Sequence, residues 1–166
     1  VSASAALTLA AFLATGTIAI GFLLGGEFLS VAIAYLLMNV LYTKWLKHVV
    51  ILDVMIVAIG FVLRVIAGGL AIEVEVSTWI LLCTIFLALF LSFSKRRHEL
   101  VLMADDASVQ RTVLSHYGPA FLDQMINVVT ASTVVSYALY TISAETVEKF
   151  DTRFLAYTTP FVLFGI

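Results

Sequence analysis

The fold of this chain follows from one stretch of 24 residues, Val49–Ile72, which reads VVILDVMIVAIGFVLRVIAGGLAI. An α-helix needs about 20 apolar residues to cross the hydrocarbon core of a membrane, so this stretch is long enough to span one. It carries only two charged residues, Asp53 and Arg64. The stretch therefore predicts a transmembrane helix.

The composition of the whole chain is that of a membrane protein. Of its 166 residues, 62% are apolar and 12% are charged, whereas soluble domains are about half apolar and about a quarter charged. The mean hydropathy is +1.10. These values exclude a soluble enzyme, a disordered segment and a basic protein that binds nucleic acid. Cys83 is the single cysteine, which excludes a disulfide scaffold.

Six apolar segments predict an all-α fold, a polytopic transmembrane bundle that forms a single domain. They are Ala3–Leu24, Phe28–Tyr42, Val49–Ile72, Thr78–Phe93, Ala120–Ile142 and Phe154–Ile166. Most connections are short, so consecutive helices should pack antiparallel. The exception is the polar stretch Ser94–Pro119, which we expect to be a cytoplasmic loop with a short surface helix in Asp105–Tyr117.

The two ends lead us to expect an internal part of a longer chain. The first residue is Val1, and Phe154–Ile166 is shorter than the roughly 20 residues of a spanning helix. No charge occurs before Glu27, so Ala3–Leu24 lacks the basic region of a secretory signal peptide. We expect this segment to remain in the protein as a helix.

Basic residues are concentrated in alternate loops. Six of the nine fall on one side of the expected bundle: Lys44, Lys47, Lys95, Arg96, Arg97 and Arg111. The opposite loops carry Glu27, Glu73, Glu75 and the mixed stretch Glu145–Arg153. Because loops rich in lysine and arginine stay in the cytoplasm, the six residues predict a cytoplasmic side, with Val1 at the same face.

Polar residues within the spans gather at this cytoplasmic end. Asp53 lies about one turn into its helix, and Arg64 follows eleven residues later on nearly the same face. For Asp53 that face favours the lining of a cavity. The alternative is an ion pair between helices or an arginine that reaches toward the outer surface, and for Arg64 both readings stay open. Asp123 and Asn127, four residues apart, share a face of the fifth segment, and Asn39 lies near the cytoplasmic end of the second. Polar groups are costly in a bilayer, so their clustering indicates a functional mouth.

Two basic stretches complete the mouth, which we define as the end of the bundle formed by residues 42–48 and 94–99. They read YTKWLKH and SKRRHE. Arginine binds phosphate through paired N–H groups and lysine binds it as a point charge, so these stretches could hold a phosphate or diphosphate. The alternative is that they are topology signals or contacts to lipid headgroups. His48 and His98 have no partner at metal-ligand spacing.

These residues carry a resemblance to a known family. The stretch Tyr42–Gly69, followed by LFLSFSKRRHEL at Leu89–Leu100, resembles the UbiA-type intramembrane prenyltransferases and, among them, the decaprenyl-phosphate phosphoribosyltransferase branch. The matching elements are Tyr42, Leu46-Lys47, Asp53, the Gly60–Arg64 run with the Ala-Gly after it, and Lys95–Leu100. The resemblance runs through all six segments in order.

The resemblance implies a bundle of nine spans in a bacterial inner membrane, of which this chain supplies the third to the eighth. It implies transfer of a 5-phosphoribosyl group from phosphoribosyl pyrophosphate to a polyprenyl phosphate, with release of pyrophosphate. Mg²⁺ is the implied cofactor, and its acidic motif would lie upstream of Val1, so this stretch by itself is expected to be inactive. Prenyltransferases carry spaced aspartates where this chain has Lys95–Arg97 and Glu99, which favours the phosphoribosyl donor.

The resemblance also implies which residues form the site. Lys47 is an expected catalytic cation at the diphosphate, and Asp53 is expected to orient a ribose hydroxyl or a lysine, or to assist a metal. The expected substrate-binding residues are Tyr42, Lys95, Arg96, Arg97, Glu99, Arg64, Asn39, Asp123 and Asn127. The polyprenyl tail would lie sideways between helices, among membrane lipids.

Two alternative functions remain open from the sequence. The first is a UbiA-type polyprenyltransferase that acts on an aromatic or glycerol-phosphate acceptor, which an acidic stretch in place of Lys95–Arg97 would favour. The second is a transporter fragment or non-catalytic membrane subunit, which predicts a polar stripe through the membrane. The polar groups here gather at one mouth, although Arg64 is deeper.

Overall fold

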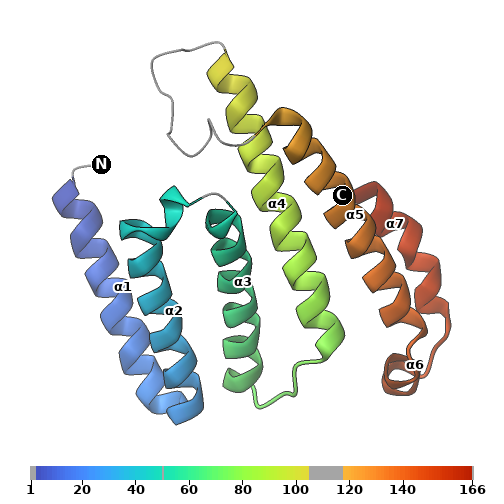
Figure 1. Ribbon diagram of the computed structural model, residues 1–166. Helices are drawn as coiled ribbons and strands as arrows, with labels where there is room; N and C mark the ends of the chain where they lie inside the picture. Colours follow the sequence, from blue (N-terminus) through green and yellow to red (C-terminus); the bar gives the residue numbers. More distant parts are fainter. Residues whose placement is uncertain (1–2, 50, 105–117, 166) are drawn as a thin grey trace.

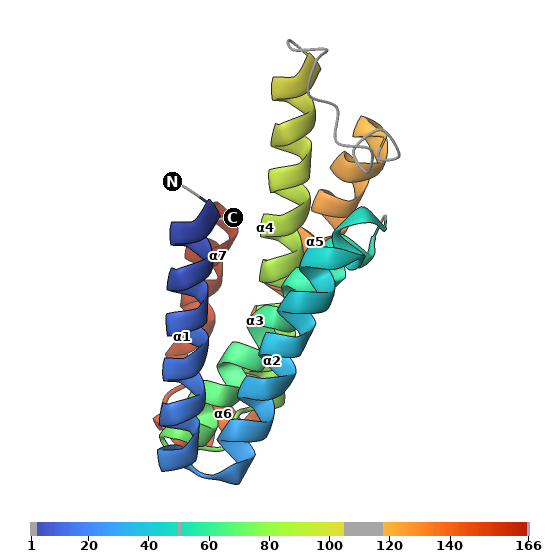
Figure 2. The same ribbon diagram turned by 90° about the vertical axis from the view of Figure 1, so that its left-hand side faces the viewer.

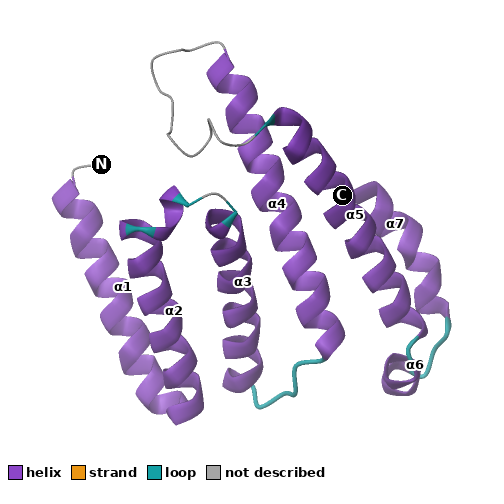
Figure 3. Ribbon diagram, viewed as in Figure 1, coloured by secondary structure: helices purple, strands orange, loops and turns teal. Residues whose placement is uncertain are grey.

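The computed structural model describes residues 3–49, 51–104 and 118–165. All regular structure in these ranges is helical (Figures 1 and 3). The longer helices are α1 (Ala3–Leu24), α2 (Gly26–Lys44), α3 (Leu52–Ala71), α4 (Thr78–Ala104) and α5 (Pro119–Ile142). The shorter ones are η1 (Leu46–His48), α6 (Ala144–Phe150), η3 (Phe154–Thr158) and α7 (Thr159–Gly165).

Five of the helices, α1 to α5, are long and apolar enough to cross a membrane. Many of their large apolar side chains are exposed, among them Leu7, Phe12 and Phe22 of α1. Such exposure is unfavourable in water but suits a helix whose outer face contacts lipid. The expectation of an all-α polytopic membrane protein is therefore confirmed.

The helices form one antiparallel row in chain order, and most contacts between helices join chain neighbours (Figure 1). Figure 2 shows α1 and α7, at the two ends of the row, on the same side of its middle helices, so the row is curved. The best-buried cluster lies between α3, α4 and α5 and contains Val54, Phe93, Leu122 and Val129. The mouth therefore stands beside the most tightly packed part of the chain.

Two tight connections depend on glycine. Gly25 joins α1 to α2 with a φ of 107°, which residues with a side chain rarely adopt. Gly69, near the end of α3, packs against the connection to α4, where an added Cβ would lie 2.9 Å from the carbonyl oxygen of Val74 and collide with Val76. These glycines allow short turns and hence close packing of consecutive helices.

One boundary differs from the sequence prediction. We expected the fourth span to end at Phe93 and a loop to begin at Ser94, but α4 continues to Ala104. That part of the loop prediction is wrong because the stretch SKRRHELVLMA is rich in strong helix formers and carries an Arg96–Glu99 ion pair three residues apart. Hydropathy falls there, but the helix goes on. Residues 105–117, with the expected surface helix and Arg111, lie outside the described residues.

Candidate active site

The last turn of α2, the first turn of α3, the polar part of α4 and the start of α5 lie toward the same end of the row of helices, which is the end with the mouth (Figure 1). The structure brings together five of the expected site residues here through ion pairs. They are Asp53, Arg96, Glu99, Arg97 and Asp123. The expectation that polar groups from several helices gather at one end of the bundle therefore agrees with the geometry.

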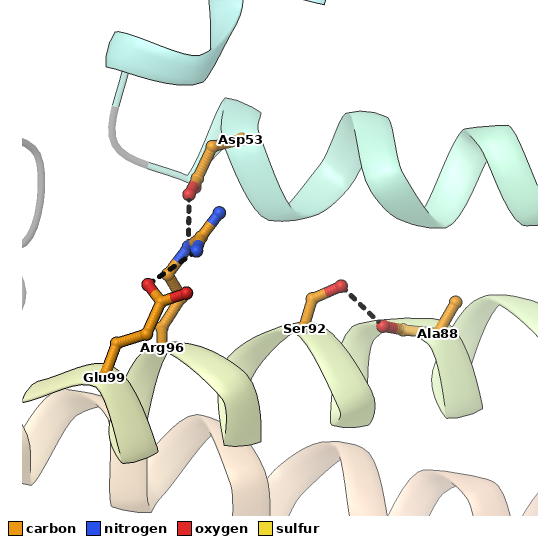
Figure 4. A network of polar contacts seen from close by, with 5 residues as sticks. All are labelled: Asp53, Ala88, Ser92, Arg96 and Glu99. Carbon is orange, nitrogen blue, oxygen red and sulfur yellow. Dashed lines mark hydrogen bonds and ion pairs between the residues drawn. The ribbon is translucent and has the colours of Figure 1, made fainter. Parts of the chain in front are cut away.

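Arg96 links α3 to α4 through a buried ion pair (Figure 4). Its Nε donates to Oδ2 of Asp53 at 2.7 Å, and its Nη1 donates to Oε2 of Glu99 at 2.8 Å. Only 8% of Arg96 and 1% of Asp53 are exposed. Removing one partner of such a pair leaves a buried charge without compensation, which costs about 3–5 kcal/mol. The guanidinium of Arg96 therefore holds two carboxylates, those of Asp53 and Glu99.

The start of α3 places Asp53 for this contact. Asp53 lies in the first turn of the helix, where the partial positive charge of the helix N-terminus favours a carboxylate. The chain enters α3 through Ile51, whose φ of 72° is unusual for a β-branched residue. Neighbouring Val54 is also buried. The apolar packing beside Asp53 and the helix terminus together fix the direction of its carboxylate.

Arg97 makes a different kind of pair, with Asp123 of α5. Its Nε donates to Oδ1 at 2.7 Å, and a longer contact of 3.4 Å joins Nη2 to Oδ2. The two side chains are 34% and 52% exposed, and exposed pairs contribute only about 0–1 kcal/mol. Successive residues on a helix point about 100° apart, so Arg96 and Arg97 contact the helices on opposite sides of α4.

The lysines of the mouth are exposed. Lys44 ends α2, Lys47 lies in η1 and Lys95 lies on α4. In the described ranges no carboxylate lies within ion-pair distance of any of the three. Tyr42, near the end of α2, is half-buried. These lysines are therefore the mouth cations whose charge is not already matched by a carboxylate of the described chain.

Arg64 lies away from the mouth, about 16 Å along α3 from Asp53 at the usual rise per residue. Its Nε and Nη2 donate to the hydroxyl of Tyr35 on α2, at 3.1 and 2.9 Å. Its guanidinium carbon also lies 4.7 Å from the ring centroid of Phe61. Although Arg64 and Asp53 share a face by sequence spacing, they contact different neighbouring helices.

Tyr35 was missed by the sequence analysis. A cation within a span needs an acceptor. A tyrosine in the middle of the preceding segment was the hint that the sequence offered. Asn39, one turn further along α2, donates from Nδ2 to the Tyr35 carbonyl at 2.7 Å, within its own helix. Asn127 is exposed on α5. Neither asparagine contacts the ion pairs of the mouth in the described structure.

A largely apolar cavity of about 450 Å³ lies between α4, α5 and α7, in the half of the bundle away from the mouth. Its lining includes Leu87, Thr133 and Tyr137, and the Tyr137 hydroxyl hydrogen-bonds to Thr158 at 2.7 Å. The Tyr137 side chain is partly buried. The cavity could accept an apolar chain.

The amino-acid sequence is similar to three curated enzymes named decaprenyl-phosphate phosphoribosyltransferase. The identity is 33% over 140 residues for the enzyme of Mycolicibacterium smegmatis, 33% over 129 for that of Corynebacterium glutamicum and 30% over 135 for that of Mycobacterium tuberculosis. These matches cover 84%, 78% and 81% of this chain. The resemblance to the decaprenyl-phosphate phosphoribosyltransferases is confirmed.

The chain is homologous to part of these UbiA-type enzymes. It spans 44%, 36% and 45% of the three relatives, which is less than half the length of each. No family model matches the chain. The similarity therefore supports the branch that the two basic stretches indicated.

The resemblance to decaprenyl-phosphate phosphoribosyltransferases implies Mg²⁺ as the cofactor, so the acidic residues of the described chain are the ones to compare with a magnesium site. In the part of the chain that the structure describes, no group of three or more histidine, cysteine or acidic side chains could hold a metal ion. Asp53 and Glu99, the acidic residues nearest the mouth on α3 and α4, both accept from Arg96. The described residues do not fit a magnesium site by themselves.

Proposed function

We propose that this chain forms part of an intramembrane transferase that moves a 5-phosphoribosyl group from phosphoribosyl pyrophosphate to a polyprenyl phosphate. The observation that carries the proposal is the set of exposed lysines at the mouth, which no carboxylate of the described chain matches. Such a set suits a donor with several phosphate groups. The similarity to phosphoribosyltransferases supports the same donor.

In this reaction an oxygen of the lipid phosphate attacks the anomeric carbon of the ribose. The bond from that carbon to the diphosphate oxygen breaks, and pyrophosphate leaves with the electron pair. The lipid phosphate is ionised at neutral pH, so the attack needs no strong general base. Negative charge develops on the leaving group, and cations placed there lower the barrier. We assign this role to Lys47 and Lys95.

Asp53 is proposed to act as a positioning residue. A carboxylate that is 1% exposed and held by a guanidinium at 2.7 Å is poorly placed to abstract a proton. Tyr42, Asn39 and Asn127 remain proposed substrate contacts, on the grounds of their place near the mouth.

The lipid tail is proposed to lie in the membrane between helices. The mouth charges are at one end of α4, and the apolar cavity lined by Leu87 and Tyr137 is at the other half. This arrangement suits an acceptor with a charged head and a long apolar tail, because each part then contacts groups of its own polarity. We propose a multi-pass protein of the cell membrane whose mouth faces the cytoplasm, as the basic loops indicate.

A transfer assay tests the proposal. The full-length gene product, in membranes with Mg²⁺, polyprenyl phosphate and donor labelled in the ribose, is expected to move label into the lipid fraction. Lys47→Ala and Lys95→Ala should each lower the rate at least about tenfold, because a charge-assisted contact is worth about 1.5–3 kcal/mol.

Lys149→Ala is the matched control, since Lys149 is an exposed lysine of α6 at the opposite end of the bundle. Its rate should equal that of the wild type. The proposal is contradicted if no label reaches lipid, or if label from a prenyl diphosphate enters an aromatic acid instead.

A further inference from the structure

Two adjacent arginines of α4 lie in contrasting surroundings. Arg96 is buried and bonded to two carboxylates, whereas Arg97 is one-third exposed and bonded to one. The sequence run KRR gives no reason to treat them differently. The contrast arises because each points toward a different helix, Arg96 toward α3 and Arg97 toward α5.

The Arg97–Asp123 pair can exchange its partner. Asp123 is 52% exposed in its side chain, so it can be solvated when the pair opens. A phosphate offers more negative charge than a carboxylate and fits the same pair of guanidinium N–H groups. A phosphate that reaches the mouth can therefore replace Asp123 on Arg97 without leaving a buried charge behind.

The Arg96 contacts cannot be exchanged in the same way. Asp53 is almost fully buried, so removal of the guanidinium would take the cation away from a carboxylate that water hardly reaches. Glu99 holds the other side of the same guanidinium, at 2.8 Å. Arg96 therefore keeps its place whether or not a phosphate is present.

We propose that Arg97 leaves Asp123 to bind a phosphate of the donor, whereas Arg96 stays with Asp53 and Glu99 and acts as a positioning residue. This inference rests on the proposed function and deepens it. While no phosphate is bound, the Asp123 carboxylate accepts the hydrogen bonds of Arg97 in its place. The step makes and breaks only hydrogen bonds: the N–H groups of Arg97 pass from carboxylate to phosphate oxygens.

Asp123→Asn gives the sharpest test, because it removes the competing charge but keeps the shape of the side chain. In the full-length gene product, binding of phosphoribosyl pyrophosphate with Mg²⁺ should become about two- to fivefold tighter, the range expected for a weak exposed pair. In an Arg97→Gln background the same substitution should change nothing. A pair that only joins α4 to α5 would give no tightening in either background.

Substitutions of the two arginines should also affect different steady-state kinetic constants. Arg97→Gln should raise the KM for the donor about tenfold or more with a smaller effect on kcat. Arg96→Gln should lower kcat with the donor KM within about threefold of wild type, and Arg96→Lys should restore part of kcat. A merely structural role for both would not divide KM from kcat in this way.

The inference is overturned if Asp123→Asn weakens donor binding or leaves it unchanged, or if Arg96→Gln raises KM as much as Arg97→Gln does. Failure of the proposed function looks different. In that case the wild-type protein itself binds no phosphoribosyl pyrophosphate and moves no label to lipid, and the inference falls with it.

Discussion

Arg64 donates two hydrogen bonds to the hydroxyl of Tyr35 across the interface of two membrane-length helices, α3 and α2. Arginine stays protonated in proteins, so this cation is present in the middle of a span. It also lies over the rings of Phe61 and Tyr35, where the faces of aromatic rings attract cations. The contact fixes the guanidinium toward α2 and away from the mouth.

Tyr35→Phe should lower the free energy of unfolding by about 1 kcal/mol, because Arg64 loses its acceptor while the ring remains. Unfolding in mixed detergent micelles, followed by circular dichroism, measures the change. Tyr157→Phe is the control, since Tyr157 is 73% exposed at the other end of the chain. Equal stabilities for both variants would contradict a stabilising role of the hydroxyl.

Asp53→Ala and Asp123→Ala should differ strongly in stability. Loss of the buried partner of Arg96 should cost about 3 kcal/mol or more, whereas loss of the exposed partner of Arg97 should cost less than about 1 kcal/mol. The same unfolding experiment compares the two. The double variant Asp53→Asn with Arg96→Gln should recover part of the loss, because no buried guanidinium then remains without Asp53, although Glu99 loses its contact with Arg96. Equal free energies of unfolding for the two single variants would contradict the expected difference between the buried and the exposed ion pair.

Two neighbouring glycines of α3 should respond in opposite ways to alanine. Gly69→Ala places a methyl group against Val76 and the Val74 carbonyl, and overpacking of this kind costs about 1–3 kcal/mol. Gly68 has open space where its Cβ would lie, so Gly68→Ala should be neutral or slightly stabilising in a helix. Melting temperatures of the two variants in detergent decide the matter. A lower melting temperature for Gly68→Ala than for Gly69→Ala would contradict the packing.

Cysteine labelling in intact cells tests the orientation. Glu75 lies in the connection from α3 to α4 and Trp45 follows α2, at the opposite end, and both are exposed. In a Cys83→Ser background, an impermeant thiol reagent should label Glu75→Cys in intact cells and Trp45→Cys only after permeabilisation. The reverse pattern would place the mouth on the outer side of the membrane.

Hydropathy was sufficient to predict the bounds of a helix wherever the helix ends at the end of its apolar part. The predicted Ala3–Leu24 is α1, and the predicted Ala120–Ile142 differs from α5 by one residue. The same criterion ended the fourth span eleven residues before the end of α4. A helix can continue beyond the apolar part when its polar residues favour helix, and hydropathy carries no information about that.

The composition of the mouth could be predicted, but its pairing could not. Sequence placed Asp53, Arg96 and Asp123 at one end because each lies near the same end of a span. Which arginine meets which aspartate depends on the rotation of α4 between α3 and α5, and that rotation is set by packing around Phe93 and Leu122. The burial that distinguishes Arg96 from Arg97 is therefore a tertiary property.

The packing of each helix chiefly on its predecessor bears on how the protein is made. A chain of this topology has few contacts that must wait for distant residues, so its contact order is low. As each span leaves the ribosome and enters the bilayer, the surface that receives it is already present. The ion pair between α3 and α4 can therefore form before α5 has been made, whereas the pair between α4 and α5 has to wait for it.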